Sequence, residues 1–316
     1  MVSPLEVIAF PGTGNIVHFI GDEKGFYNNT GIEVNLTGTP SSAYQISNFH
    51  DEKYDIASTA IDNIVAYTEG QGSAKLDGKP DFSVVLGGAQ IELPFIVAPF
   101  IKTYEDLKGQ SIALDALSTG FAFILYRMLE NAGLKPGDYE LASVGGTDKR
   151  WESLKSGEHV GALLNDPFSK FAIEAGFHQL ESSIDVLDHY QAGIFAVRRS
   201  WASKNEGRLL AFIDAHLNVL DWFLDPANFQ ESVSIMARNL PQLGEKGAAA
   251  AVNRLMSPQT GFSPKATIDE KGLQTVLALR SRYAEPKKML TNTSKYLDLS
   301  WYTKVLTEPE KKFRET

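Results

Sequence analysis

Polar residues at the start of a predicted helix are the clearest candidates for chemistry in this sequence. Residues 114–123 read LDALSTGFAF and pass from a predicted strand through Ser118, Thr119 and Gly120 into an apolar helix. The first N–H groups of a helix have no partner inside it, so they attract a capping side chain or an anionic ligand. We expect Ser118 and Thr119 to divide capping and ligand contact between them.

Other predicted strands are followed by similar polar turns, such as PGTGN at residues 11–15 and STAIDN at residues 58–63. Each turn is open to the same two interpretations, because a residue that could touch a ligand could also cap a helix or pack in the core. The further candidate contacts from these turns are Thr13, Gly14, Asn15, Ser41, Thr59, Asp62, Gln90, Asn165 and Tyr190.

The charges near these strand ends are mostly negative. The acidic residues are Asp62, Glu92, Asp115 and Asp166, and the nearby bases are Lys149 and Arg150. An anionic ligand would therefore be held mainly by hydroxyl and N–H groups, with Arg150 as the possible charged partner. Alternatively, one or two acids would bind a cationic or N–H-rich ring.

The motifs of common enzymes and metal proteins do not occur. The chain has no cysteine, and its six histidines show neither HxH nor HExxH spacing. Gly12 and Gly14 form a GxG without the GxxG or GK of a nucleotide-binding loop, and there is no GxSxG elbow. We therefore predict no catalytic residue, no cofactor and no metal site.

Composition narrows the class of protein further. A net charge of -9 without a basic cluster argues against nucleic-acid binding. No run approaches the roughly 18 apolar residues of a membrane span. A length of 316 residues is sufficient for two domains, each with its own core.

The order of predicted elements indicates an α/β fold with two lobes. Strands are expected at residues 5–10, 33–36, 55–58 and 83–86, and again at 94–98, 111–114, 140–144 and 160–164, with helical patterns between them. Such alternation predicts two parallel sheets covered by helices. One more strand is expected at 193–198.

The last third of the chain has a different pattern. Apolar residues recur at spacings of three and four from Leu209 to Phe223, which is typical of a helix with one buried face. We expect a helical extension on lobe one, and crossings between the lobes near Pro94 and Ala192. The predicted division is lobe one at 1–92 and 199–316, and lobe two at 93–198.

Four segments carry a resemblance to a known family: GDEKGFYNNTGIEVNL (21–36), YDIAST (54–59), YEDLKGQSIALDALSTG (104–120) and the long stretch 129–167. With them the chain resembles the type II periplasmic solute-binding proteins of ABC importers, in the subgroup for sulfonates, taurine, nitrate and thiamine-pyrimidine precursors. The similarity covers about residues 5–200.

The resemblance implies two Rossmann-like lobes joined by a two-stranded hinge, closing on a small organic molecule: a carboxylate, a sulfonate or a heterocycle. It also implies a monomer that works with a membrane ABC permease. Its location would be periplasmic or membrane-anchored and extracytoplasmic, although a signal segment is absent from this chain. The alternative is an enzyme on the same fold, in thiamine-pyrimidine or menaquinone-type biosynthesis.

Overall fold

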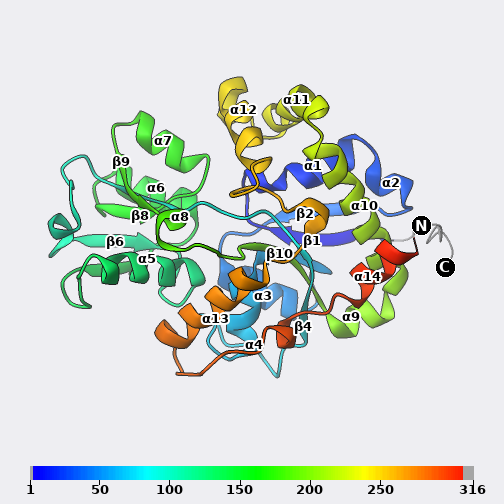
Figure 1. Cartoon of the computed structure of the whole chain (residues 1–316), viewed down its shortest axis with the longest axis horizontal. Helices are drawn as coiled ribbons and strands as arrows, with labels where there is room; N and C mark the ends of the chain where they lie inside the picture. The colour runs from blue at the N-terminus through cyan, green and yellow to red at the C-terminus, as the bar shows by residue number, and fades with distance from the viewer. Residues whose placement is uncertain (1–2, 309–316) are drawn as a thin grey trace.

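The computed structural model describes residues 3–308 and contains two five-stranded sheets, each covered by helices and lying side by side (Figure 1). The first sheet has the order β2-β1-β3-β10-β4, with β1 Leu5–Ala9, β2 Val34–Gly38, β3 Ile56–Ala60, β4 Phe82–Gly87 and β10 Gly193–Arg198. The second has the order β7-β6-β8-β5-β9, with β5 Pro94–Val97, β6 Ser111–Leu114, β7 Glu140–Ser143, β8 Gly161–Leu163 and β9 His178–Ser182. The predicted α/β class is confirmed.

The helices follow the predicted alternation and then form the C-terminal extension. Those of the first two-thirds are α1 Ile16–Glu23, α2 Phe26–Asn29, α3 Ser42–His50, α4 Ile61–Thr68, α5 Gly120–Asn131, α6 Thr147–Lys155, α7 Phe168–Glu174 and α8 Ser183–Val186. The extension holds α9 Arg199–Lys204, α10 Glu206–Leu224, α11 Phe229–Asn239, α12 Gly244–Leu255, α13 Glu270–Tyr283 and α14 Ser300–Thr307. Short 3-10 helices are η1 Thr13–Asn15, η2 Tyr104–Leu107, η3 Pro226–Asn228, η4 Pro241–Leu243, η5 Pro264–Ala266 and η6 Thr293–Tyr296.

The sheets are mixed, so the prediction of parallel sheets was wrong in part. Strand β10 runs antiparallel to β3 and β4, and β5 runs antiparallel to β8 and β9. Both strands follow a crossing between the lobes, and an apolar run in the sequence carries no sign of the direction in which its strand will pair. The polar segment His178–Ser182 was not predicted as a strand, because it lies at the sheet edge and its side chains are mostly half-buried or exposed.

The boundary of lobe two needs a correction at its end. Residues 193–198 were assigned to lobe two, but β10 pairs with β3 and β4 in the first sheet. The physical reason is that the chain has already crossed back when this strand begins. We propose that lobe two ends before residue 193, and the rest of the predicted division stays a prediction.

The two connections between the lobes run next to each other. The N–H of Gly88 donates to Gly193 O at 2.8 Å, and the N–H of Gly193 donates to Ala89 O at 2.9 Å. A Cβ on Gly193 would lie 2.6 Å from Ala89 O, so this close approach requires glycine. The segment after β4 and the segment at the start of β10 therefore pair with each other and form the expected two-stranded connection.

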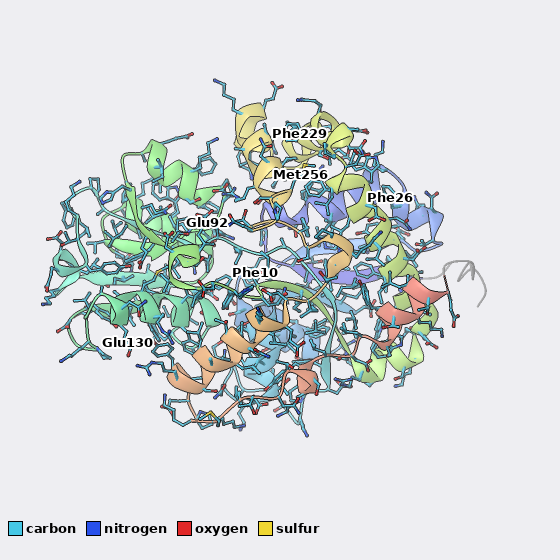
Figure 2. All side chains as sticks on the ribbon, viewed as in Figure 1. Phe10, Phe26, Glu92, Glu130, Phe229 and Met256 are labelled. Atoms are coloured by element: carbon cyan, nitrogen blue, oxygen red, sulfur yellow. The ribbon has the colours of Figure 1, made fainter. Side chains whose placement is uncertain are left out.

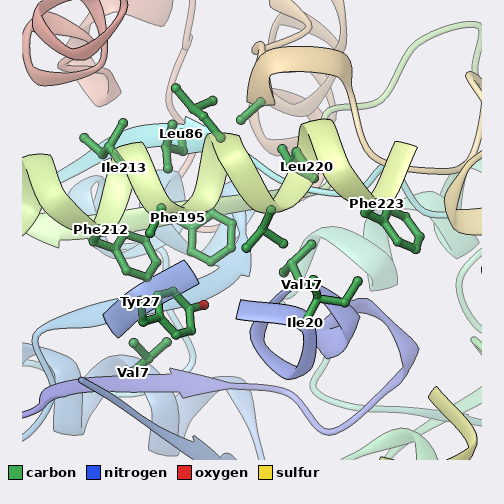
Figure 3. Close-up of a cluster of buried hydrophobic side chains, with 14 of the residues drawn as sticks. Val7, Val17, Ile20, Tyr27, Leu86, Phe195, Phe212, Ile213, Leu220 and Phe223 are labelled. Carbon is green, nitrogen blue, oxygen red and sulfur yellow. The ribbon is translucent and has the colours of Figure 1, made fainter. Parts of the chain in front are cut away.

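Helix α10 packs its apolar face on the first sheet and buries the core of lobe one (Figure 3). Phe212, Ile213 and Leu220 of α10 are fully buried, and Phe212 lies edge-on to Phe195 of β10 with ring centroids 5.7 Å apart. The spacing of three and four residues in the sequence is thus confirmed as a buried helix face.

Two histidines are buried in this core. His216 of α10 is fully buried, and neither ring nitrogen has a hydrogen-bond partner within residues 3–308. Its ring centroid lies 4.5 Å from that of Phe195. Nδ1 of His18 lies 3.0 Å from the hydroxyl of Tyr27. Burial lowers the pKa of His18 to about 4 and that of His216 to about 3, so both rings are neutral at pH 7.

These two buried histidines make the free energy of unfolding depend on pH. Both pKa values are lowered from 6.5 on folding, so the unfolded chain binds more protons between pH 6.5 and about 4, and the free energy of unfolding falls as pH falls through that window. The loss is on the order of 3 kcal/mol per histidine at pH 4. Urea unfolding at pH 7.5 and pH 5 measures this. The free energy of unfolding should fall less between the two pH values in His216→Leu than in the wild type, and an equal fall would show that His216 is not the cause.

Candidate functional site

A cleft of about 550 Å³ lies between the two sheets and is lined by both lobes. Lobe one contributes the turns after β1, β2 and β3, and lobe two contributes the starts of α5, α6 and α7. Phe10 and Glu92, both lining residues, lie between the lobes in Figure 2. The turns after β1, β3 and β6 lie beyond the carboxyl ends of parallel strands, where open α/β sheets bind ligands.

Most of the predicted contacts come together in this cleft. The lining includes Thr13, Gly14, Asn15, Thr59, Asp62, Gln90, Thr119 and Asn165. They come from both lobes and from the connection between them. Whether each touches a ligand stays a prediction.

Three predicted contacts lie outside the cleft lining. The Ser41 hydroxyl caps α3 by accepting a hydrogen bond from the Tyr44 N–H at 3.2 Å. The carbonyl oxygen of Ser118 accepts from Arg280 Nη2 at 3.3 Å. The Tyr190 hydroxyl is buried without a partner in the described part of the chain. Burial, and to a smaller extent the nearby Asp62 carboxylate, holds its pKa well above the ordinary value. Ser41 thus caps a helix and Tyr190 packs against both cores, which are the alternatives that the sequence left open, and ligand contact by the three residues stays a prediction.

Thr119 both caps α5 and lies at the cleft, and its contact with a ligand stays a prediction. Its hydroxyl caps α5 by accepting from the Ala122 N–H at 3.3 Å, and the residue also lines the cleft. The turn therefore presents Thr119, and not Ser118, to the cleft.

The N-terminus of α5 is occupied by a carboxylate of the other lobe. The Gly120 N–H donates to Asp62 Oδ2 at 2.7 Å, and Arg280 Nη1 donates to the same oxygen at 2.7 Å. A Cβ on Gly120 would lie 2.5 Å from Asp62 Cγ, so only glycine allows this approach. Asp62 is 1% exposed and Arg280 is fully buried. Asp62 thus fills the position that an anionic ligand would take at this helix.

Arg280 connects α13 with both lobes. Its Nε donates to Gln71 Oε1 at 3.1 Å, its Nη2 donates to the carbonyl oxygens of Gln71 and Ser118, and its guanidinium lies 5.0 Å from the Phe123 ring centroid. Buried side chains of α13 also belong to both cores, with Leu277 in lobe one and Leu279 in lobe two.

Two further side-chain contacts bridge the lobes around the cleft. Ser42 Oγ donates to Asp115 Oδ2 at 2.9 Å, and Arg254 of α12 forms an ion pair with Asp166. Arg254, Thr260 and Phe262 of the C-terminal extension also line the cleft, and none of them was predicted from the sequence. Nothing in their local pattern distinguishes them, because only the packing of the extension brings them to the cleft.

The charged lining is mixed. The acids are Asp62, Glu92, Asp115, Asp148 and Asp166, and the bases are Lys149, Arg150 and Arg254. Arg150 is 5% exposed, and burial lowers its pKa while Asp115 and Asp148 oppose the shift. Its Nη2 donates to Thr147 Oγ1 at 2.8 Å, but its buried Nε has no partner among the residues that the structure describes. Within residues 3–308 no group of three or more His, Asp or Glu side chains is placed to hold a metal ion.

Comparison with solved structures finds the same fold in binding proteins. The periplasmic nitrate-binding protein of Synechocystis PCC 6803 is 14% identical, with a TM-score of 0.78 over 98% of this chain and 89% of that chain. The ligand-binding component of an ABC-type import system from Staphylococcus aureus, with zinc bound, is 14% identical, with a TM-score of 0.77 over 96% and 98%. The aliphatic sulphonate-binding protein of Escherichia coli is 16% identical, with a TM-score of 0.65 over 93% and 95%.

Fold and cleft together define a two-lobed α/β protein with the periplasmic binding protein fold, as the resemblance in the sequence implied. The model of the NMT1-like family matches residues 3–237, and the chain belongs to this family. No curated protein matches it in sequence.

The Asp62–Arg280 pair should dominate the stability of the junction between the lobes. Arg280→Met leaves the Asp62 carboxylate buried without its cation, and breaking such a pair costs about 3–5 kcal/mol. The double variant Asp62→Leu/Arg280→Met buries no charge, so it should be more stable than Arg280→Met alone. Urea unfolding of the wild type, both single variants and the double variant measures this, and additive losses would argue against coupling.

Proposed function

We propose that this chain is an extracytoplasmic solute-binding protein that captures a small organic molecule between its lobes and delivers it to a membrane ABC permease. The observation that carries the proposal is the cleft of about 550 Å³, lined by both lobes and spanned by two adjacent connections. Ligand pockets of proteins are commonly concave sites of about 300–1,000 Å³. Two lobes on such a connection can close around a ligand by a hinge motion.

The similar structures support the same role. Two of them are named as binding proteins, for nitrate and for aliphatic sulphonates, and the third is named as the ligand-binding component of an import system. Among the described residues, no helix has the length and apolar character needed to cross a membrane. We propose that the protein acts as a monomer outside the cytoplasm, and that it binds its ligand without changing it.

A ligand screen tests the proposal. Thermal unfolding is measured with aliphatic and aromatic sulfonates, carboxylates and pyrimidines. A ligand that binds only the folded protein stabilises it by about 2.7 kcal/mol at one hundred times its Kd, which raises the midpoint by several degrees. Light scattering of the bound protein gives its oligomeric state. The ligand is then recovered and analysed by NMR, and a chemical change would support the enzyme interpretation instead.

Gly14→Leu should abolish the response to any ligand of the cleft. Gly14 lines the cleft, and a Cβ added to it meets no atom within 4 Å, so a leucine adds bulk at the wall of the cleft without displacing a neighbour. Circular dichroism and the ligand-free midpoint should stay close to the wild type.

Gly14→Ala is the matched control, because its single methyl group occupies little of the cleft and should preserve most of the ligand response. An undiminished ligand response in Gly14→Leu would place the binding site elsewhere and overturn the proposed cleft.

A further inference from the structure

A second cavity, of about 600 Å³, lies on lobe two and outside the cleft between the lobes. It is formed by the second half of α5, the segment 133–139 that follows, β7 and the end of α13. Among the described residues, none lines both this cavity and the cleft. Glu130 of the second cavity lies on lobe two, apart from Phe10 of the cleft (Figure 2).

We propose that this cavity, here called the tyrosine pocket, binds an uncharged planar aromatic molecule. Its volume falls in the range of about 300–1,000 Å³ that is common for small-molecule sites. The inference goes beyond the proposed function and does not depend on it, because the tyrosine pocket and the cleft are lined by different residues.

The rings of the lining favour a flat aromatic ligand. Three half-buried tyrosines, Tyr126, Tyr139 and Tyr283, line the pocket. The rings of Tyr126 and Tyr283 have centroids 5.8 Å apart and an interplanar angle of 78°. Aromatic rings prefer offset-stacked and edge-to-face contacts. Because these two rings are nearly perpendicular, a planar ligand can lie parallel to one of them while it meets another edge-on.

The hydroxyl groups of the tyrosines differ in what they have left to offer. The Tyr126 hydroxyl donates to the Leu117 carbonyl oxygen at 2.8 Å, and the Tyr283 hydroxyl donates to the Glu130 carboxylate. The Tyr139 hydroxyl has no hydrogen-bond partner within residues 3–308. It can therefore bind one polar substituent of a ligand. The remaining apolar contacts come from Leu134, Pro136 and Leu141.

The charges around the pocket disfavour a charged ligand. Hydrogen bonds from Arg282, and then from the Tyr283 hydroxyl, lower the pKa of Glu130 to about 2. Arg282 thus matches the charge of Glu130, and its guanidinium lies 5.5 Å from the Tyr283 ring centroid, where a ligand cation would bind that ring. Lys135 of the lining is exposed, so its attraction for an anion is weak and screened.

The experiment compares 2-naphthol with its saturated analogue, decahydro-2-naphthol, at pH 7 by NMR of the leucine methyl groups. Leu134 and Leu141 report on the tyrosine pocket, and Leu255 reports on the cleft. 2-Naphthol should shift the methyl signals of Leu134 and Leu141. It should bind about fivefold more tightly than decahydro-2-naphthol, because only a flat ring pairs with the tyrosine rings. Choline and 2-naphthoate are the charged probes and should bind more weakly than 2-naphthol.

Variants of Tyr139 test the role of the ring. Tyr139→Leu keeps an apolar side chain without a ring, so it should weaken 2-naphthol binding about fivefold and leave decahydro-2-naphthol nearly unaffected. Tyr139→Phe keeps the ring and should retain most of the affinity. Tyr44→Leu is the matched control, because Tyr44 is a partly exposed tyrosine of α3 in lobe one, and it should change the Kd less than twofold.

Near-ultraviolet circular dichroism checks the fold of each variant, and the comparison of probes on the wild type decides the inference if a variant fails to fold. The inference is overturned if 2-naphthol leaves the Leu134 and Leu141 signals unshifted, or if decahydro-2-naphthol or a charged probe binds as tightly. It is also overturned if Tyr139→Leu loses no more affinity than Tyr44→Leu.

The outcome for the proposed function is separate. Gly14→Leu changes the cleft only, so it should leave the shifts of Leu134 and Leu141 by 2-naphthol unchanged. If 2-naphthol binds the tyrosine pocket but no compound of the ligand screen binds the cleft, this inference stands and the proposed function fails. If the screen finds a cleft ligand while the tyrosine pocket stays empty, the proposed function stands and this inference fails.

Discussion

The buried ion pair between Asp62 and Arg280 is the interaction on which the rest of the molecule depends. It joins α4 of the first lobe to α13 of the extension, and the same carboxylate accepts the first N–H of α5 in the second lobe. Burying two charges is costly unless geometry and further hydrogen bonds compensate. Here Gln71 and the Ser118 carbonyl accept three further hydrogen bonds from the guanidinium, whereas Asp62 Oδ1 is buried without a partner among the described residues.

This network also determines the electrostatics of the cleft. The N-terminus of α5 was the strongest candidate for an anion site in the sequence. Because the Asp62 carboxylate accepts its first N–H, a ligand anion cannot take that position. Arg150, another cation of the lining, is buried, and its Nε has no acceptor among residues 3–308. The acids near it keep the site from being strongly positive.

The C-terminal extension contributes to the cores of both lobes and to the cleft. Helix α10 completes the core of lobe one, α12 brings Arg254 to Asp166 across the cleft, and α13 places apolar side chains in the cores of both lobes. The lobes are therefore joined by α13 as well as by the paired connections at Gly88 and Gly193.

The sequence by itself determined the α/β class, most strands and helices, and the turns that line the cleft, because the period of apolar residues and the turn chemistry are local properties. It did not determine strand direction, the strand of residues 193–198 in the first sheet, or the contribution of Arg254 and Phe262. The sequence also could not show that Thr119 and not Ser118 lines the cleft, or that Arg280 forms an ion pair with Asp62. Only the tertiary structure decided these, because 218 positions separate Arg280 from Asp62 and their contact exists only when both lobes and the extension pack together.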